Sequence, residues 1–309
     1  MLIEALPQPG ILRDAVAPLT SLMHRSMEVC SAEGCRRRLP AWSGFWGGNH
    51  GCFANSDWFC SFGCMEKGIA EAIEIGRAQL HSRPAVVNRM PLGLMLMGRG
   101  VITHEQLKAA LAARGTSTLR IGQVLMQNFG VEEEAITQSI AGQSSCAVFR
   151  AKAVQESLLH SVPLELVERF GMVPVHISQN RKNLYVGFNG LIDRGILYAL
   201  EMMLGCHTEP CILSDSTFQA LLEKIRGRGA DRTGMKGFST SEEIASMICS
   251  RALKTRDACV RFTTCGDSIW TRIAGSEKTI DLLFARYPDV CHTAGNLKSS
   301  IAAADEDHG

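Results

Sequence analysis

Two stretches of the sequence decide the fold: PLGLMLMGRGVITHEQLKAALAAR, residues 91–114, and RIGQVLMQNFGVEEEAITQSIAGQ, residues 120–143. They are one short helical pattern written twice, with residues 115–119 between the copies. Each copy predicts two amphipathic helices joined at its second glycine, Gly100 or Gly130, because glycine suits the left-handed backbone that ends a helix. The second copy has one residue fewer between this glycine and its next apolar helix position.

The second helix of each copy carries apolar residues at helical spacing, which predicts a buried face. These residues are Leu107, Leu111, Ile136 and Ile140. Thr103 and Gln106 predict a capping box at the start of the second helix of copy one, because their side chains can each bond the other's backbone N–H. We therefore expect the four helices to share one core.

The doubled pattern resembles the N-terminal domain of type II secretion and type IV pilus assembly ATPases. The motif of that family is Arg-Leu-Gly, an apolar stretch, Gly, two spaced leucines and Gln, and a five-residue spacer separates its copies. In some members the doubled motif binds cyclic di-GMP. The resemblance implies that copy two would supply the ligand-binding residues Arg120, Ile121, Gly122, Leu125, Gly130 and Gln143.

Copy one departs from the family pattern at two positions. Pro91 stands where the family has arginine, and Arg114 stands where it has glutamine. Proline supplies neither a charge nor a backbone N–H, and the loss of one charge-assisted contact costs about 1.5–3 kcal/mol, at least tenfold in affinity. Two hypotheses follow: a cyclic di-GMP site built on copy two, or a helical core kept for folding and for contacts with protein partners.

Four cysteines in the first predicted domain, residues 1–84, have spacings that suit a metal ion. They are Cys30, Cys35, Cys60 and Cys64. A helix whose first turn carries both Cys60 and Cys64 is expected to continue over Glu66–Leu80, and another is expected over Ile11–Met27. The order of cysteine-bearing turn, hairpin and helix resembles a treble-clef zinc finger. Four thiolates leave Zn²⁺ no open position, so the predicted zinc is structural.

Alternatives for this segment stay open. His50 or Cys52 could replace one of the four ligands, or the cysteines could be ordinary buried thiols. Arg36, Arg37 and Arg38, together with Trp42 and Trp46, could offer cations and stacking surfaces to nucleic acid. The tryptophans could equally pack over the zinc knuckle.

The remaining sequence predicts an α+β multidomain protein. Residues 85–150 form the tandem helical subdomain, and residues 151–230 add a small sheet with helices that completes the region resembling the secretion ATPases. A small C-terminal α+β unit is expected over residues 238–292, after a glycine-rich linker, Arg226–Thr240. In that unit, Trp270 and Asp281 are interpreted as a core residue and a cap, with recognition residues as the alternative. Residues 293–309 are predicted to be a disordered tail.

Composition excludes several classes. The net charge is +1 and no apolar run approaches the roughly 18 residues that a membrane helix needs. Glu4, Pro7 and Pro9 are atypical of a signal peptide, so we expect a cytoplasmic protein whose 12 cysteines are not in disulfides. The sequence has no Gly-x4-Gly-Lys-Ser/Thr and no catalytic constellation that we recognise, which predicts a protein that is not an enzyme.

Three functions therefore compete at the level of sequence. The first is a non-enzymatic cytoplasmic adaptor or regulator that binds protein partners in a secretion or pilus context. The second is a cyclic di-GMP sensor that works through the degenerate doubled motif. The third is a regulator that binds nucleic acid through the zinc finger.

Overall fold

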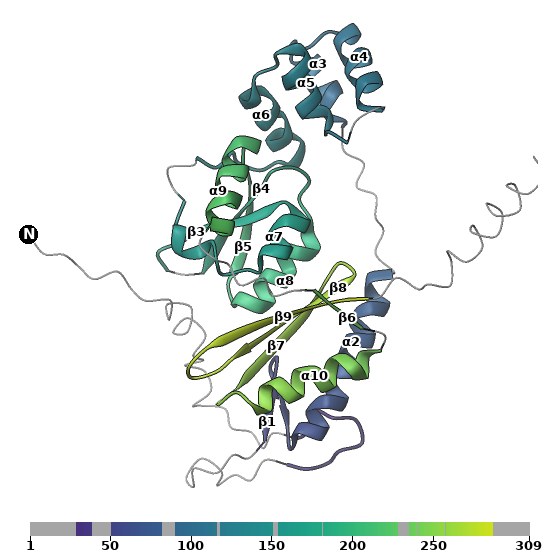
Figure 1. Ribbon diagram of the computed structural model, residues 1–309, viewed down its shortest axis with the longest axis vertical. Coiled ribbons are helices and arrows are strands. Elements are labelled where there is room, and N and C mark those ends of the chain that lie inside the picture. Colours follow the sequence, from purple (N-terminus) through teal and green to yellow (C-terminus); the bar gives the residue numbers. More distant parts are fainter. Residues whose placement is uncertain are drawn as a thin grey trace, which may run out of the picture. The chain divides into compact units, whose positions relative to one another are not determined.

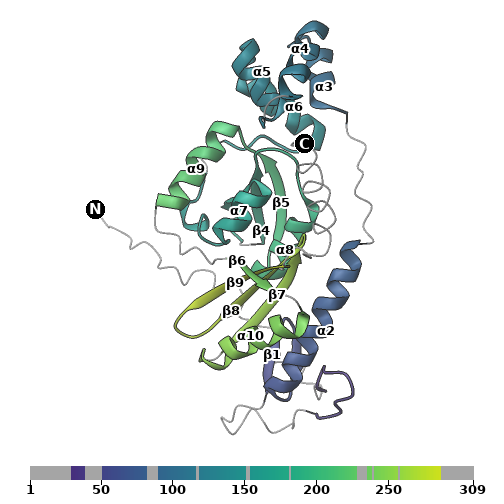
Figure 2. The ribbon, with the colours of Figure 1, turned by 45° about the vertical axis from the view of Figure 1, so that its right-hand side comes forward.

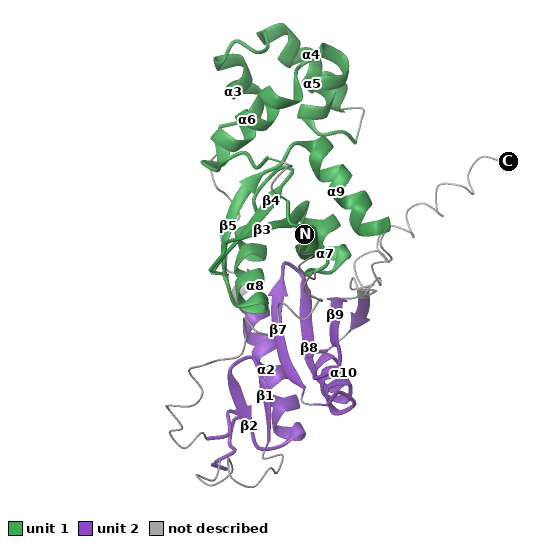
Figure 3. Cartoon of the chain, turned by 90° about the vertical axis from the view of Figure 1, so that its left-hand side faces the viewer, with its two compact units in different colours: residues 1–25, 80–234 green, residues 26–79, 235–309 purple. Residues whose placement is uncertain are grey.

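The computed structural model describes residues 29–38, 51–81, 90–115, 118–150, 154–180, 182–227, 235–238, 240–256 and 258–286. The chain divides into two compact units, which Figure 3 shows in different colours. Unit 1 comprises residues 1–25 and 80–234, and unit 2 comprises residues 26–79 and 235–309. The helix predicted over Ile11–Met27 and the tail from residue 293 lie outside the described residues.

Unit 1 begins with the tandem repeat, which forms four short helices (Figure 1). They are α3 (Leu92–Gly98), α4 (His104–Gly115), α5 (Ile121–Phe129) and α6 (Glu133–Ser144). The left-handed glycines predicted between the helices of each copy are confirmed, since φ is +72° at Gly100 and +63° at Gly130. The predicted capping box is also confirmed: the backbone N–H groups of Thr103 and Gln106 each donate to the other's side-chain oxygen.

The first glycine of each motif lets the two helices of a copy pack closely. A Cβ on Gly93 would lie 2.4 Å from Leu107 Cδ1, and a Cβ on Gly122 would lie 3.1 Å from Ile136 Cγ2. The four helices share a core made of Leu96, Ile102, Leu107, Ala110, Val124, Leu125, Val131 and Ile136. One predicted core residue was wrong: Leu111 is 52% exposed, because Ala110 takes the inward position of that helical turn.

The rest of unit 1 is a three-stranded sheet with helices. Its elements are η2 (Glu156–Leu158), α7 (Leu164–Phe170), β3 (Met172–Ile177), β4 (Asn183–Phe188), α8 (Arg194–Leu204), β5 (His207–Ile212) and α9 (Asp215–Gly227). Strands β3 and β4 form the predicted antiparallel hairpin, and β5 runs parallel to β4 after the crossover through α8. The predicted cap of α9 was Asp215 or Ser216, but the cap is Ser214, whose Oγ accepts the N–H of Thr217.

The described residues of unit 2 form a six-stranded sheet and two helices. Its elements are β1 (Cys52–Ala54), β2 (Asp57–Phe59), α2 (Phe62–His81), β6 (Met235–Phe238), α10 (Ser241–Leu253), β7 (Cys259–Cys265), β8 (Ser268–Ala274) and β9 (Thr279–Arg286). The strand order is β2-β1-β7-β8-β9-β6. Within this order β1 pairs in parallel with β7, and β6 pairs in parallel with β9.

This sheet differs from the predicted division of the chain. The sequence predicts residues 1–84 and residues 238–292 as separate domains, whereas the structure places their strands in one sheet over one core. The linker predicted over Arg226–Thr240 also contains a strand, β6, whose Phe238 is buried. Strands of three and four residues carry too little periodicity to be recognised from sequence.

Helices α2 and α10 pack on the same face of this sheet (Figure 2). Met65, Ile69 and Ile73 of α2 share a core with Ile244 and Ile248 of α10. The strands contribute Val260, Phe262, Ile269, Ile273, Leu282 and Phe284 to the same core. The N-terminal and C-terminal segments of unit 2 are thus halves of a single hydrophobic core.

Trp270 and Asp281 have clear structural roles. Trp270 is fully buried, as predicted, and its Nε1 donates to Asp281 Oδ1 over 2.9 Å. Asp281 is not the predicted cap: it lies opposite Arg272 in the ladder and accepts two hydrogen bonds from its guanidinium, each 2.8 Å. The Arg272 guanidinium also lies 5.0 Å from the centre of the Trp270 ring, a cation–π distance.

Candidate functional site

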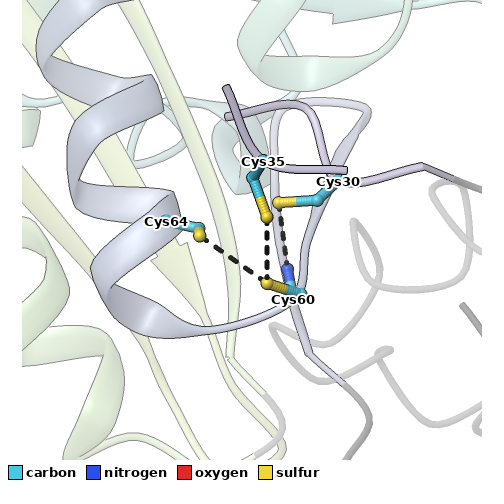
Figure 4. A group of neighbouring side chains, drawn as sticks. All are labelled: Cys30, Cys35, Cys60 and Cys64. Carbon is cyan, nitrogen blue, oxygen red and sulfur yellow. Dashed lines mark hydrogen bonds between the residues drawn. The ribbon is translucent and has the colours of Figure 1, made fainter. Parts of the chain in front are cut away.

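The structure brings the four predicted cysteines together in unit 2 (Figure 4). Cys30 and Cys35 lie in the turn of residues 29–38, Cys60 follows β2, and Cys64 lies in the first turn of α2. All four sulfur atoms lie within 4.8 Å of one another. The Sγ–Sγ distance is 3.7 Å between Cys35 and Cys60 and 3.6 Å between Cys60 and Cys64.

This spacing suits a tetrahedral metal ion. Zn–S bonds of about 2.3 Å place the sulfur atoms of a tetrahedral site about 3.8 Å apart. The backbone N–H of Cys60 donates to Cys30 Sγ, with a distance of 3.4 Å between nitrogen and sulfur. Burial raises the pKa of Cys30, but hydrogen bonds led by this one outweigh it and lower the pKa to about 7, whereas burial and the neighbouring thiols raise the pKa of Cys60 to about 12. The cluster can therefore hold a metal ion such as zinc.

Cys52 does not belong to the cluster. Its thiol is within hydrogen-bonding distance of the carbonyl oxygen of Phe59, at 3.7 Å, and burial raises its pKa to about 11, so it is neutral at physiological pH. His50, Trp42 and Trp46 lie outside the described residues. Arg36, Arg37 and Arg38 are exposed next to the cluster.

A second candidate site is a cavity of about 720 Å³ in unit 1. Four of the six predicted ligand-binding residues line it: Arg120, Ile121, Gly122 and Gln143. The other two do not. Leu125 is fully buried in the helical core, and Gly130 forms the left-handed turn between α5 and α6.

The cavity also has walls that the motif does not predict. Arg114 and Leu92 come from copy one, and the mixed subdomain contributes Arg169, Phe170, Gly171, Asn189, Gly190, Leu191, Ile192, Asp193, Leu213 and Asp215. The Asn189-Gly190 turn could be predicted from sequence, but its place beside the repeat could not. Tertiary packing alone brings these segments together.

Polar contacts connect the two parts of unit 1 at this cavity. Arg120 Nη1 donates to the carbonyl oxygen of Asn189 at 3.0 Å and to its Oδ1 at 3.2 Å. Asp215 accepts from Gln123 Nε2 at 3.0 Å and from Asn189 Nδ2 at 3.3 Å. These bonds join the start of α5 to the loop after β4 and to the start of α9.

The carboxylates that line the cavity are already engaged with donors. Glu133 accepts from the backbone N–H of Ser216 at 2.7 Å and from its hydroxyl at 2.6 Å. Asp193 accepts from the backbone N–H groups of Gly195 and Ile196 and so caps α8. These hydrogen bonds stabilise the charged form of each carboxylate, so the lining carries the carboxylates of Glu133, Asp193 and Asp215 as well as the guanidinium groups of Arg114, Arg120 and Arg169.

Among the helices that the structure describes, none is both long enough and apolar enough to span a membrane.

The comparisons with known proteins cover only part of the chain. No family model matches it. Bacteriophage adsorption protein B of Escherichia coli (strain K12) is 31% identical over 117 residues, which are 37% of this chain. Bacteriophage N4 adsorption protein B of Escherichia coli O157:H7 matches with the same identity and length. The chain spans 15% of the length of these two curated relatives.

Two solved structures also resemble part of the chain. MshE, solved with cyclic di-GMP, matches 44% of this chain and 99% of its own, with a TM-score of 0.37 and 21% sequence identity. The N-terminal domain of XpsE matches 43% of this chain and 92% of its own, with a TM-score of 0.34 and 17% identity. The chain thus has structural similarity to the N-terminal domains of the secretion ATPases MshE and XpsE.

Proposed function

We propose that this chain is a non-enzymatic regulatory protein that binds cyclic di-GMP in the cavity of unit 1. The observation that carries the proposal is the convergence of Arg120, Ile121, Gly122 and Gln143 on one cavity. Cyclic di-GMP is the ligand that the resemblance of the doubled motif implies. The cavity volume of about 720 Å³ falls in the roughly 300–1,000 Å³ range of small-molecule sites.

The cavity supplies the groups that a cyclic dinucleotide needs. Arg114, Arg120 and Arg169 are cations for its phosphates, and guanidinium pairs well with phosphate oxygens or stacks on a base. Leu92, Ile121, Met126, Ile136 and Ile140 are apolar surfaces that can exclude water from the faces of the guanines. Asn189 and Asp215 also line the cavity, where they hold Arg120 and Gln123 in place through hydrogen bonds.

The same proposal assigns no catalysis to the chain and gives the cysteine cluster a structural zinc ion. The absence of a P-loop motif from the sequence supports the first point. The second is supported by four thiols at mutual distances that a tetrahedral ion requires, which leave no ligand position for a substrate.

Isothermal titration of the full chain with cyclic di-GMP tests the binding site. We expect Arg120→Ala to weaken binding at least tenfold, because it removes a charge-assisted contact worth about 1.5–3 kcal/mol. Arg251→Ala, at the exposed end of α10 in unit 2, is the matched control and should bind as the wild type does. No heat of binding from the wild-type chain would exclude the sensor function.

A second candidate function is an adaptor that docks on a protein of a secretion or pilus machinery. The observation in its favour is an exposed apolar stripe on α8, where Tyr198 is 55% exposed and Met202, one turn later, is 42% exposed. Exposed apolar side chains in one place are typical of protein–protein contact surfaces.

Photo-crosslinking in cells tests the adaptor function. A photoreactive residue at position 202 should give a discrete adduct with a component of such a machinery. The same probe at Gln219, exposed on α9, is the control and should not. Equal labelling from both positions would contradict docking through the stripe.

A further inference from the structure

The helices of the tandem repeat pair across the two copies, and the end of copy two lies against the start of copy one. The side-chain amide of Gln143, the last motif residue of copy two, donates to the carbonyl oxygen of Met90, just before copy one. Helix α3 packs on α6, and α4 packs on α5. Arg114, the last motif residue of copy one, correspondingly lines the same cavity as Arg120, the first motif residue of copy two.

This arrangement distributes the arginines of the doubled motif unequally around the cavity. One pair of equivalent positions is Arg114 with Arg120, which carries two guanidinium groups. The other pair is Gln143 with Pro91, which carries none. Arg169 also lines the cavity, and its guanidinium lies 5.7 Å from the centre of the Phe170 ring.

Arg114 is available to bind an anion. It lies exposed in the last turn of α4, and no residue that the structure describes forms a hydrogen bond or ion pair with its guanidinium. Arg120 donates to Asn189 through Nη1 alone, which leaves the other donors of its planar fork for a ligand.

We infer that Arg114 is a phosphate-binding residue that replaces the cation missing at position 91, so that one phosphate of the ligand is held by two arginines and the other by none. The inference rests on the proposed binding of cyclic di-GMP and specifies how this chain achieves it. Copy one then lacks the positive charge of the motif at position 91 but carries a positive charge at position 114, so the number of arginines in the doubled motif is unchanged.

Isothermal titration of the full chain with cyclic di-GMP tests whether Arg114 has taken over the role of an arginine at position 91. Arg114→Gln, which inserts the family's residue, should weaken binding at least tenfold. Pro91→Arg, which inserts the other family residue, should strengthen it, and the double variant should regain most of the affinity lost in Arg114→Gln. Thermal unfolding of each variant should match the wild type, because residues 91 and 114 are both exposed.

The outcomes separate this inference from the proposed function. A wild-type chain that binds cyclic di-GMP while Arg114→Gln keeps its affinity overturns the role of Arg114 alone. Loss of binding in Arg114→Gln with no recovery in the double variant overturns the relocation of charge. A wild-type chain that does not bind cyclic di-GMP overturns the proposed function and this inference together.

Discussion

At the scale of single residues, the cysteine cluster shows how one side chain can connect a site. Cys60 lies 3.7 Å from the sulfur of Cys35 and 3.6 Å from that of Cys64, and its backbone N–H donates to the sulfur of Cys30. It therefore contacts every other member of the cluster. The sequence predicts which four cysteines form the cluster. The exclusion of Cys52 follows only from the structure, where Cys52 lies opposite Phe59 in the β1–β2 hairpin.

We predict about one zinc ion per purified chain and its loss in Cys60→Ser. A serine hydroxyl is a much poorer ligand than a thiolate, and removing the central sulfur leaves three donors. Elemental analysis of the purified protein measures the metal content. Cys259→Ser, which changes an exposed cysteine of β7, is the control and should keep its zinc. A folded wild-type protein without metal would contradict the zinc site.

At the scale of elements, the repeat was the most predictable part of the chain. Two glycines, an apolar period and a Thr–Gln pair carry enough information because helix formation depends on neighbours three and four residues away. The prediction for Leu111 was wrong because the sequence of one helix does not show which of two neighbouring residues faces the helix that it packs against. The cap of α9 was misplaced for a similar reason, since Ser214, Asp215 and Ser216 are all good caps.

We predict that Gly100→Ala and Gly130→Ala each destabilise unit 1 by about 1–2 kcal/mol, because both glycines have left-handed φ values that an L side chain resists. Urea unfolding followed by circular dichroism measures the change. Gly98→Ala is the matched control: it lies at the end of α3, where a Cβ would meet no atom within 4 Å, and it should be neutral or stabilising. An equal loss of stability in all three variants would contradict the backbone argument.

At the scale of the whole molecule, unit 2 was the part that sequence reasoning divided wrongly. The parallel pairing of β1 with β7 joins Phe53 to Cys259 and Ala54 to Val260. The local sequence of β1 cannot predict that it pairs with a strand about 200 residues away, and β1 is only three residues long. The cysteine cluster and the C-terminal sheet were therefore predictable as separate pieces and not as one body.

We predict that removal of zinc with a chelator destabilises unit 2 as a whole and spares unit 1. Met65 and Ile69 of α2 share a core with α10 and β8, so loosening the cluster should raise amide exchange in all three elements. Hydrogen–deuterium exchange measured by mass spectrometry reports each segment separately. Helices α3–α6, which have a core of their own, are the internal reference. Faster exchange confined to residues 29–64 would show that the shared core does not depend on the metal.

The shared sheet of unit 2 has a consequence for biosynthesis. Strand β1 is complete at Ala54, but its partner β7 starts at Cys259, so about 205 residues must be translated in between. At about 5–20 residues per second, the ribosome needs roughly 10–40 s to deliver that partner. During this interval residues 80–234 of unit 1 are made, and the apolar side of α2 does not yet have β7–β9 to cover. Zinc binding by the four cysteines during translation would stabilise the N-terminal segment of unit 2 until the C-terminal segment has been synthesised.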